Sequence, residues 1–467
     1  MSHRIRLVIL TAANLLSFVV TRAQERVVTH AQQHPLSIKE VLTLIETGQP
    51  RMHAYKEQTA AAGDNISLAR NTLVPSLTAG YQAGYATDNN STGMIYPGLL
   101  MPISGPVNAR SSNSQIPGTA LAAFLQWTPV TFGQRAAAVE KAAAEYRLSG
   151  SVYDNALFQQ RYTGILTYIS IVYLQRLLNT QQANIQRTAT GLQQSLGLAK
   201  QGLRPGLDTV QFQSLLAQAT MEVLNTQKLY TAQVLELCRL TGLTDRPEDL
   251  LFTDTALATQ LPVQPDTTGG YAQNPVYRYY QAQTAVSAAN LKEADRGWRP
   301  RMDVWANAYS RGSGIDPSGV VNKADGWQLS RSNLGAGVQL SFPILQIARV
   351  NIQKRQYRSL LRADQDQLAQ VDQNLRRQVE TAESNYRQNL LIAREAPVQS
   401  KAARLSYQGL ELSYQSGLVD FTRLTQGQYQ LLYAEMTEAD ANLQVWRALL
   451  DIGVAKGNLN LFTDQLK

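Results

Sequence analysis

The sequence predicts a mainly α-helical fold combined with a membrane β-barrel, and three observations support this prediction. Landmark residues recur in the same order in both halves of the 467-residue chain. Each half holds two segments of about 10 residues with alternating apolar and polar side chains, the pattern of half-buried strands. Between them run long stretches whose apolar residues are spaced by three and four, as in coiled coils.

The chain begins with a pattern typical of a secretory signal peptide. Arg4 and Arg6 precede an apolar run at 7–20, and Thr21, Arg22 and Ala23 form a small-x-small cleavage site. Residues 1–23 are therefore expected to be removed, and the alternative is a buried N-terminal helix. Gln24 follows the cleavage site in place of a cysteine, so we expect no lipid anchor there.

The remainder is predicted to be an internal duplication. Pro50 and Pro275 are separated by the same interval as Pro75 and Pro300. A second shared interval separates Gly202 from Gly417 and Gly242 from Gly457. A repeated order of landmarks indicates a repeated structural unit. The predicted organisation is a first repeat at 24–242, a linker at 243–273, a second repeat at 274–457 and a C-terminal tail at 458–467.

Each repeat is expected to open with a helix and then contribute two strands. The alternating segments lie near 75–87 and 119–131 in the first repeat, and near 300–310 and 333–344 in the second. They are long enough to cross a bilayer as tilted strands. An ordinary antiparallel sheet with one wet face has the same alternation and is the alternative. Since four strands cannot close a membrane barrel, a membrane location requires several copies to share one wall.

Two helical hairpins are predicted at 133–241 and 346–456. Pro397 is expected to interrupt and kink the long helix of the second hairpin. At each hairpin tip, a glycine that can end a helix precedes an aspartate that can cap the next one. These pairs are Gly202 with Asp208 and Gly417 with Asp420.

Composition and motifs argue against catalysis and cofactors. Cys238 is the only cysteine, and no sequence motif of a hydrolase or of a nucleoside triphosphatase is present. We therefore expect no catalytic residues, no metal site and no cofactor, and the protein is not expected to be an enzyme. The net charge of +8 is modest and its basic residues are spread along the chain, which argues against nucleic acid as a partner.

Several segments together resemble the TolC family of outer-membrane efflux proteins. Residues 36–40, Pro50 and 73–77 are similar to the family's opening helix and first strand. Residues 125–130 with Gly133 resemble its second strand and the entry to the long helix, with Thr128 as an extra residue. Residues 414–421 resemble its second hairpin tip, so the resemblance covers nearly the whole mature chain.

The resemblance implies a homotrimer whose strands close a barrel in outer-membrane lipid and whose helices form a coiled-coil barrel in the periplasm. Such a protein is a passive exit duct of a tripartite efflux or type I-like secretion system. It docks to a periplasmic adaptor protein, and through it to an inner-membrane efflux pump or ABC transporter. The implied cargo is small molecules, metal ions or polypeptides. A non-conducting periplasmic coiled-coil scaffold is the alternative.

The resemblance also carries site residues onto the two tips. The family's adaptor contacts correspond to Gly202, Leu203 and Arg204 in the first tip, and to Gly417 and Leu418 in the second. Its periplasmic gate corresponds to positions just before and after the second tip, namely Tyr414, Asp420 and Arg423. A side-chain pair between Asp420 and Arg423 is expected there, and the alternative is that Asp420 is only a helix cap.

Overall fold

The computed structural model describes residues 34–87, 113–203, 205–263, 269–315, 318 and 320–466. The predicted signal peptide and most of the first inter-strand loop lie outside these residues. Two compact units are present. Unit 1 comprises Met1–Tyr55, Tyr153–Arg278 and Gln370–Lys467, and unit 2 comprises Lys56–Val152 and Tyr279–Ala369. Most of the described chain is helical, which confirms the predicted mainly helical fold.

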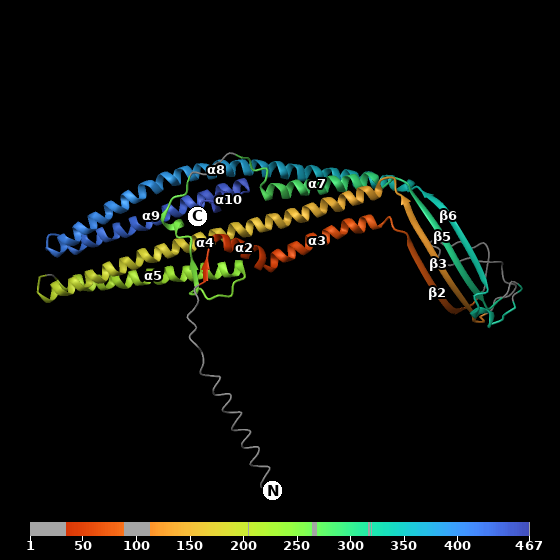
Figure 1. The fold of residues 1–467 in the computed structure, drawn as a ribbon, viewed down its shortest axis with the longest axis horizontal. Helices are drawn as coiled ribbons and strands as arrows, with labels where there is room; N and C mark the ends of the chain where they lie inside the picture. Colours follow the sequence, from red (N-terminus) through yellow and green to blue (C-terminus); the bar gives the residue numbers. More distant parts are fainter. Residues whose placement is uncertain are drawn as a thin grey trace, which may run out of the picture. The chain divides into compact units, whose positions relative to one another are not determined.

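Unit 2 contains a four-stranded antiparallel sheet in the order β2-β3-β5-β6 (Figure 1). The strands are β2 (Ser76–Ala86), β3 (Ile116–Val130), β5 (Arg301–Ser313) and β6 (Arg331–Ser341). The central pair, β3 and β5, brings together segments from the two halves of the chain. Consequently β2 and β6 are the two edges of the sheet, and each leaves one side of its backbone without a strand partner within the sheet.

The sheet exposes large apolar side chains to an extent that is unusual for a water-soluble domain. Every residue of β2 is exposed, including Leu77 and Tyr81, and Leu334 on β6 is 87% exposed. A large exposed apolar surface marks a place where a membrane or another protein binds.

Strand β3 contains a bulge at the position of the predicted extra residue. Trp127 pairs with Val304 and Val130 pairs with Met302, so Thr128 and Pro129 together face Asp303. The Thr128 hydroxyl donates a hydrogen bond of 2.5 Å to the buried Asp303 carboxylate. The bulge therefore accommodates Thr128 without disturbing the register on either side.

Two glycines of β6 make room for a tryptophan of β5. A Cβ atom on Gly337 would lie 2.9 Å from the Trp305 ring, and one on Gly335 would lie 2.6 Å from the Asn307 side-chain oxygen. Trp305 is the direct register partner of Gly337. The Gly335-Ala336-Gly337 sequence thus allows bulky side chains on the neighbouring strand to pack across the sheet.

Helices of unit 2 continue from the strands. They are most of α3 (Pro50–Asn71) and α7 (Pro275–Arg296), with the first parts of α4 (Gln134–Lys200) and α8 (Ile347–Gln415). Short 3-10 turns lie at Asp325–Trp327 and Ile344–Gln346. Ion pairs join neighbouring helices, among them Lys141 with Glu293 at 3.0 Å and Lys292 with Glu140. Such partly exposed pairs add about 0–1 kcal/mol each, so they orient the helices more than they stabilise them.

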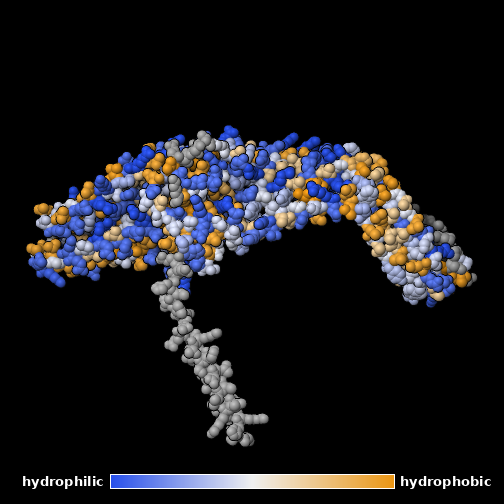
Figure 2. Space-filling view, viewed as in Figure 1, coloured by the Kyte–Doolittle hydropathy of each residue, from blue (hydrophilic) through white to orange (hydrophobic). Residues whose placement is uncertain are grey.

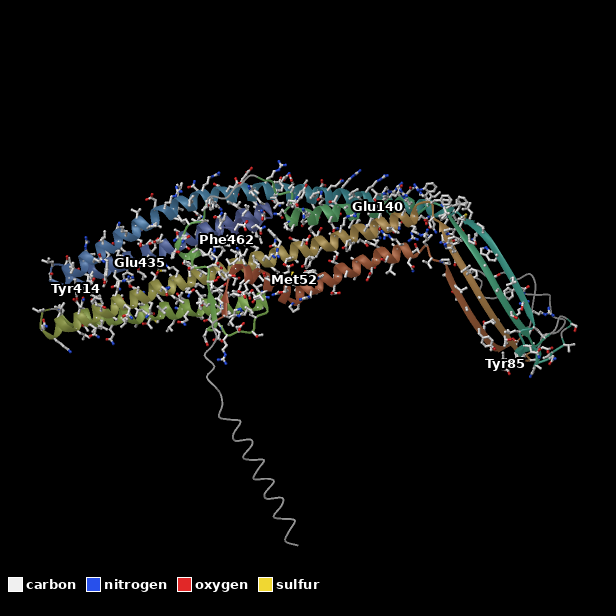
Figure 3. The ribbon with its side chains drawn as sticks, viewed as in Figure 1. Met52, Tyr85, Glu140, Tyr414, Glu435 and Phe462 are labelled. Carbon is white, nitrogen blue, oxygen red and sulfur yellow. The ribbon has the colours of Figure 1, made fainter. Side chains whose placement is uncertain are left out.

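Unit 1 is a helical assembly in which long helices run side by side (Figure 1). Its main elements are α2 (Ile38–Gly48), most of α4, α5 (Gly206–Thr241), the second part of α8 and α9 (Phe421–Lys456). The largest apolar cluster lies here, around the fully buried Trp446 and Tyr168. Trp446 packs edge-on against Phe462, which Figure 3 labels, with ring centroids 5.6 Å apart.

Four short elements of unit 1 were not predicted from the sequence. Strand β1 (His34–Leu36) pairs in parallel with β4 (Leu250–Phe252), and two short helices are α6 (Ala256–Thr259) and α10 (Asn460–Thr463). Segments of three or four residues are too short to display a period of 2 or 3.6. The segments treated as a linker and a tail therefore contribute ordered structure to the core.

The predicted interruption at Pro397 is wrong. Helix α8 runs from Ile347 to Gln415 with Pro397 inside it. Proline lacks the N–H that would donate to the carbonyl of Ala393, so the helix loses one hydrogen bond there. Ala393 and Ala396, in the turn before the proline, are buried in the large cluster, and this packing holds the helix in place there.

Within the described residues, the helices are each too short or too polar to cross a membrane.

Candidate gate and docking site at the helical tips

The two hairpin tips end their long helices in the same way. Gly202 and Gly417 adopt left-handed backbone conformations, with φ of +70° and +77°. The following residues, Leu203 and Leu418, donate backbone hydrogen bonds to the carbonyls of Leu198 and Ser413 at 3.0 and 2.8 Å. This bond over five residues, combined with a left-handed glycine, is a Schellman motif. Each tip is therefore a defined turn that only glycine forms without strain.

Each turn presents an exposed leucine. Leu203 is 66% exposed and Leu418 is 79% exposed. Arg204, the third expected contact of the first tip, lies outside the described residues. A leucine held outward by a rigid turn is available to pack against a partner, because the turn itself leaves it no intramolecular neighbour to bury it.

Asp420 caps α9. It precedes the first helical residue, Phe421, and its carboxylate accepts a 2.8 Å hydrogen bond from the Arg423 backbone N–H. Among the ion pairs of the described residues there is none between Asp420 and the Arg423 guanidinium, so these two residues meet through the backbone. Both side chains are exposed in the single copy. The cap occupies one carboxylate oxygen and leaves the negative charge at the surface.

The expectation that Asp208 caps the helix after the first tip is wrong. Helix α5 begins at Gly206, its N-cap is Pro205, and no side chain caps it. Asp208 lies in the first turn of α5 and is only 9% exposed. Its carboxylate accepts a 2.9 Å hydrogen bond from the Tyr414 hydroxyl. The acidic residue of the first tip therefore binds the tyrosine of the second.

Aromatic packing surrounds this bond. Tyr414 is fully buried, and Phe212 lies edge-on to both Tyr414 and Phe421, at centroid distances of 6.4 and 4.8 Å. The cluster also contains Tyr407, Leu424 and Leu431. Burial raises the pKa of Tyr407 to about 12. Because the surroundings are apolar, the Tyr414–Asp208 bond is shielded from water and is costly to break.

A polar layer lies further along the same helices from the tips. The Gln428 side-chain amide of α9 donates to Asn184 at 3.0 Å and to Thr188 at 2.6 Å, both on α4. Next to it Glu435 binds two arginines, Arg187 of α4 at 2.9 Å and Arg404 of α8 at 2.8 Å. Figure 3 labels Glu435 on this part of α9. The layer links three helices through polar groups that are buried or half-buried except for the exposed Arg404, and such networks fix one packing arrangement.

The structure brings together Tyr414, Asp208 and the start of α9, but it leaves the tip leucines and Arg423 at the surface. The sequence analysis missed the partner of Tyr414 and the role of Phe212. Both belong to the first hairpin, far away in sequence, and nothing in the local pattern of either tip links the two. In the described part of the chain, no group of three or more His, Cys, Asp or Glu side chains could hold a metal ion.

Residues 41–243 match the model of the family described as outer membrane efflux protein. The match agrees with the predicted resemblance to TolC-like proteins over these residues, and the matched family and the structural neighbours are channels.

Solved outer-membrane proteins have the same fold. The outer-membrane channel OprN is 16% identical, with a TM-score of 0.71, and covers 90% of this chain and 90% of its own. CusC is 11% identical, with a TM-score of 0.74 and coverages of 90% and 92%. VceC from Vibrio cholerae is 13% identical, with a TM-score of 0.73 and coverages of 90% and 96%. Among the curated proteins, none matches the sequence of this chain.

Proposed function

We propose that the protein is a homotrimeric outer-membrane channel that serves as the passive exit duct of a tripartite efflux or type I-like secretion system. The observation that carries this proposal is the four-stranded sheet with two open edges and exposed apolar side chains on its strands. Unpaired backbone groups are not tolerated in lipid. Three copies would pair β2 of each with β6 of the next and close a wall of twelve strands.

The helices supply the periplasmic part of the duct. Helix α4 has 67 residues and α8 has 69, which corresponds to about 100 Å each at about 1.5 Å per residue. Helices of this length exceed what a compact core needs, and they suit a tunnel that bridges the space between two membranes. The chain carries no catalytic role in this proposal. It conducts small molecules, metal ions or polypeptides that other components deliver.

The tips are the proposed docking surface for a periplasmic adaptor protein, which connects the duct to an inner-membrane efflux pump or ABC transporter. Members of the outer membrane efflux protein family work in such three-part systems. Leu203 and Leu418 are the proposed apolar contacts, and Gly202 and Gly417 hold them outward. Arg204 belongs to this surface as a prediction from the sequence alone.

We place the gate at the second tip. The Tyr414–Asp208 hydrogen bond ties the second hairpin to the first, so outward movement of α8 and α9 breaks it. Around a threefold axis, three copies of Asp420 would attract cations and repel one another, and Arg423 of each copy would lie within one helical turn. An adaptor that binds the open arrangement more tightly than the closed one would shift the population to the open state.

Cell fractionation tests the proposal. The outer-membrane fraction of cells that express the full chain is separated by electrophoresis with and without heating. We expect a trimer that runs as a monomer after heating, and purified trimer should insert into planar bilayers and conduct. A soluble monomer that does not insert would instead support the periplasmic scaffold.

A further inference from the structure

The turn between β3 and α4 has an unusual backbone. Phe132 has a φ of +48°, and among the described residues it is the only non-glycine with a positive φ. Gly133 follows with a φ of +94°. A left-handed bulky residue costs of order 1–3 kcal/mol, and such strain gathers at functional sites. The turn holds the Phe132 side chain at the surface, 47% exposed.

Two arginines converge on this turn. Arg299 Nη1 donates a 2.8 Å hydrogen bond to the Phe132 carbonyl oxygen, and Arg296 Nη1 donates a 3.3 Å bond to the Gly133 carbonyl oxygen. A Cβ atom on Gly133 would lie 2.3 Å from Arg296 Nη1 and 3.2 Å from Arg299 Nη1. The two guanidinium groups therefore meet over one point of the backbone, and a side chain at position 133 would require them to move.

The nearby carboxylates already have cations of their own. Asp295 pairs with Lys354, Glu293 pairs with Lys141 at 3.0 Å, and Asp303 pairs with Arg301 at 3.3 Å. Among the ion pairs of the described residues, neither Arg296 nor Arg299 has a carboxylate within ion-pair distance. The Asp295 carboxyl, whose pKa is lowered mainly by its hydrogen bond to Lys354, also feels the charges of both arginines. Two like charges at one point repel each other, and an anion between them would remove that repulsion. Each guanidinium has nitrogens beyond the one bound to the turn, in the geometry that suits a phosphate.

Exposed aromatic rings lie at the same end of the sheet. Trp298 is exposed between the two arginines in sequence, and Phe342 is exposed just beyond β6. The register pairs Val130 with Met302 and Arg301 with Ser341, so the strand ends that carry Phe132, Trp298 and Phe342 are adjacent. Figure 2 shows apolar residues gathered where the sheet of unit 2 meets its helices. Aromatic belts of this kind lie at the level of lipid headgroups.

We propose that this turn binds the phosphate headgroup of an anionic phospholipid, held between the guanidinium groups of Arg296 and Arg299. The inference rests on the proposed function, because it requires the sheet to cross the outer membrane with its helical end on the periplasmic side. Phe132, Trp298 and Phe342 lie in the interfacial layer beside the headgroup. These rings favour a lipid over free phosphate, since a soluble anion gains nothing from apolar neighbours.

Native mass spectrometry of the full chain tests the site. The protein is reconstituted in bilayers of phosphatidylcholine mixed with phosphatidylglycerol, and the lipids it retains on release are identified. We expect the wild type to retain phosphatidylglycerol over phosphatidylcholine. In Arg296→Gln/Arg299→Gln this preference should fall about tenfold, the effect of losing one charge-assisted contact set. Arg358→Gln/Arg362→Gln removes the same charge from exposed positions of α8 and should retain the wild-type preference.

A second variant guards against misfolding. Arg296→Lys/Arg299→Lys keeps both charges and one donor for each carbonyl but loses the guanidinium geometry, so it should fold and show an intermediate preference. An unchanged preference in the glutamine variant would overturn the proposal, as would an equal loss in the α8 control. Displacement of the lipid by soluble glycerol 3-phosphate would assign the site to a free phosphate and overturn the lipid. If the wild type inserts and conducts but retains both lipids equally, the lipid site is refuted and the proposed function stands. If the wild type fails to insert, the proposed function is refuted.

Discussion

Asp420 shows how one side chain serves local structure while carrying a charge that the cap does not use. Its carboxylate accepts the Arg423 backbone N–H and so fixes the start of α9. An asparagine caps a helix about as well as an aspartate but carries no charge. The two roles can therefore be separated by substitution.

We predict that Asp420→Ala and Asp420→Asn both raise single-channel conductance in planar bilayers. The physical reason is the loss of the proposed pairing between the Asp420 and Arg423 charges, which would hold the constriction closed. If only the alanine variant differs from the wild type, Asp420 acts as a cap alone. Unchanged conductance in both variants would reject the gate at this residue.

Tyr414 is the second residue on which the gate depends. Tyr414→Phe removes the hydroxyl that donates to the buried Asp208 carboxylate. An unsatisfied buried acceptor lowers the free energy of unfolding by about 1–3 kcal/mol. We predict faster hydrogen exchange of the backbone amides near the start of α5, together with more frequent open states. Tyr407→Phe is the matched control, since this buried tyrosine of the same helix makes no bond to Asp208. Equal effects of the two substitutions would mean that only packing matters.

The sequence pattern locates some of the gate residues but not the contact between them. Tyr414 and Asp420 stand beside the second glycine turn, so the tip pattern locates them. The bond between Tyr414 and Asp208 joins residues of different hairpins and appears only once the hairpins are packed together. For the same reason Asp208, a residue type that commonly caps helices, is instead a buried hydrogen-bond acceptor.

At the scale of elements, the sheet depends on a fit between Trp305 and the glycines opposite it. Gly337→Ala places a Cβ 2.9 Å from the Trp305 ring, and such overpacking costs about 1–3 kcal/mol. We predict a lower yield of heat-modifiable oligomer and a lower melting temperature by circular dichroism. Gly80→Ala on β2 is the control, because a Cβ there meets no atom within 4 Å in the single copy. Comparable losses in both variants would contradict this account.

Long elements were easier to anticipate than short ones, because a period needs several turns or alternations to be visible. The predicted segment near 300–310 overlaps β5, at Arg301–Ser313, whereas β1 and β4 have three residues each and left no signal. At Pro397 the sequence instead predicted an interruption that is not there. Its local preference predicts a break, but burial of Ala393 and Ala396 in the main cluster outweighs the loss of one hydrogen bond.

For the whole molecule, the central proposal is that one copy is incomplete. Its sheet has two free edges and exposed apolar side chains, while unit 1 has a buried core of its own. The mainly helical fold and the resemblance to the efflux-protein family follow from the sequence, through the duplicated landmarks and the tip pattern. The number of copies and the pairing between them depend on contacts that no single chain contains.

The most direct test is an electron cryomicroscopy map of the purified full chain in lipid nanodiscs. The account predicts three copies around one axis, with β2 of each copy hydrogen-bonded to β6 of the next and the bilayer surrounding the sheet. A single copy, or an assembly in which those two edges stay unpaired and outside the bilayer, would contradict it.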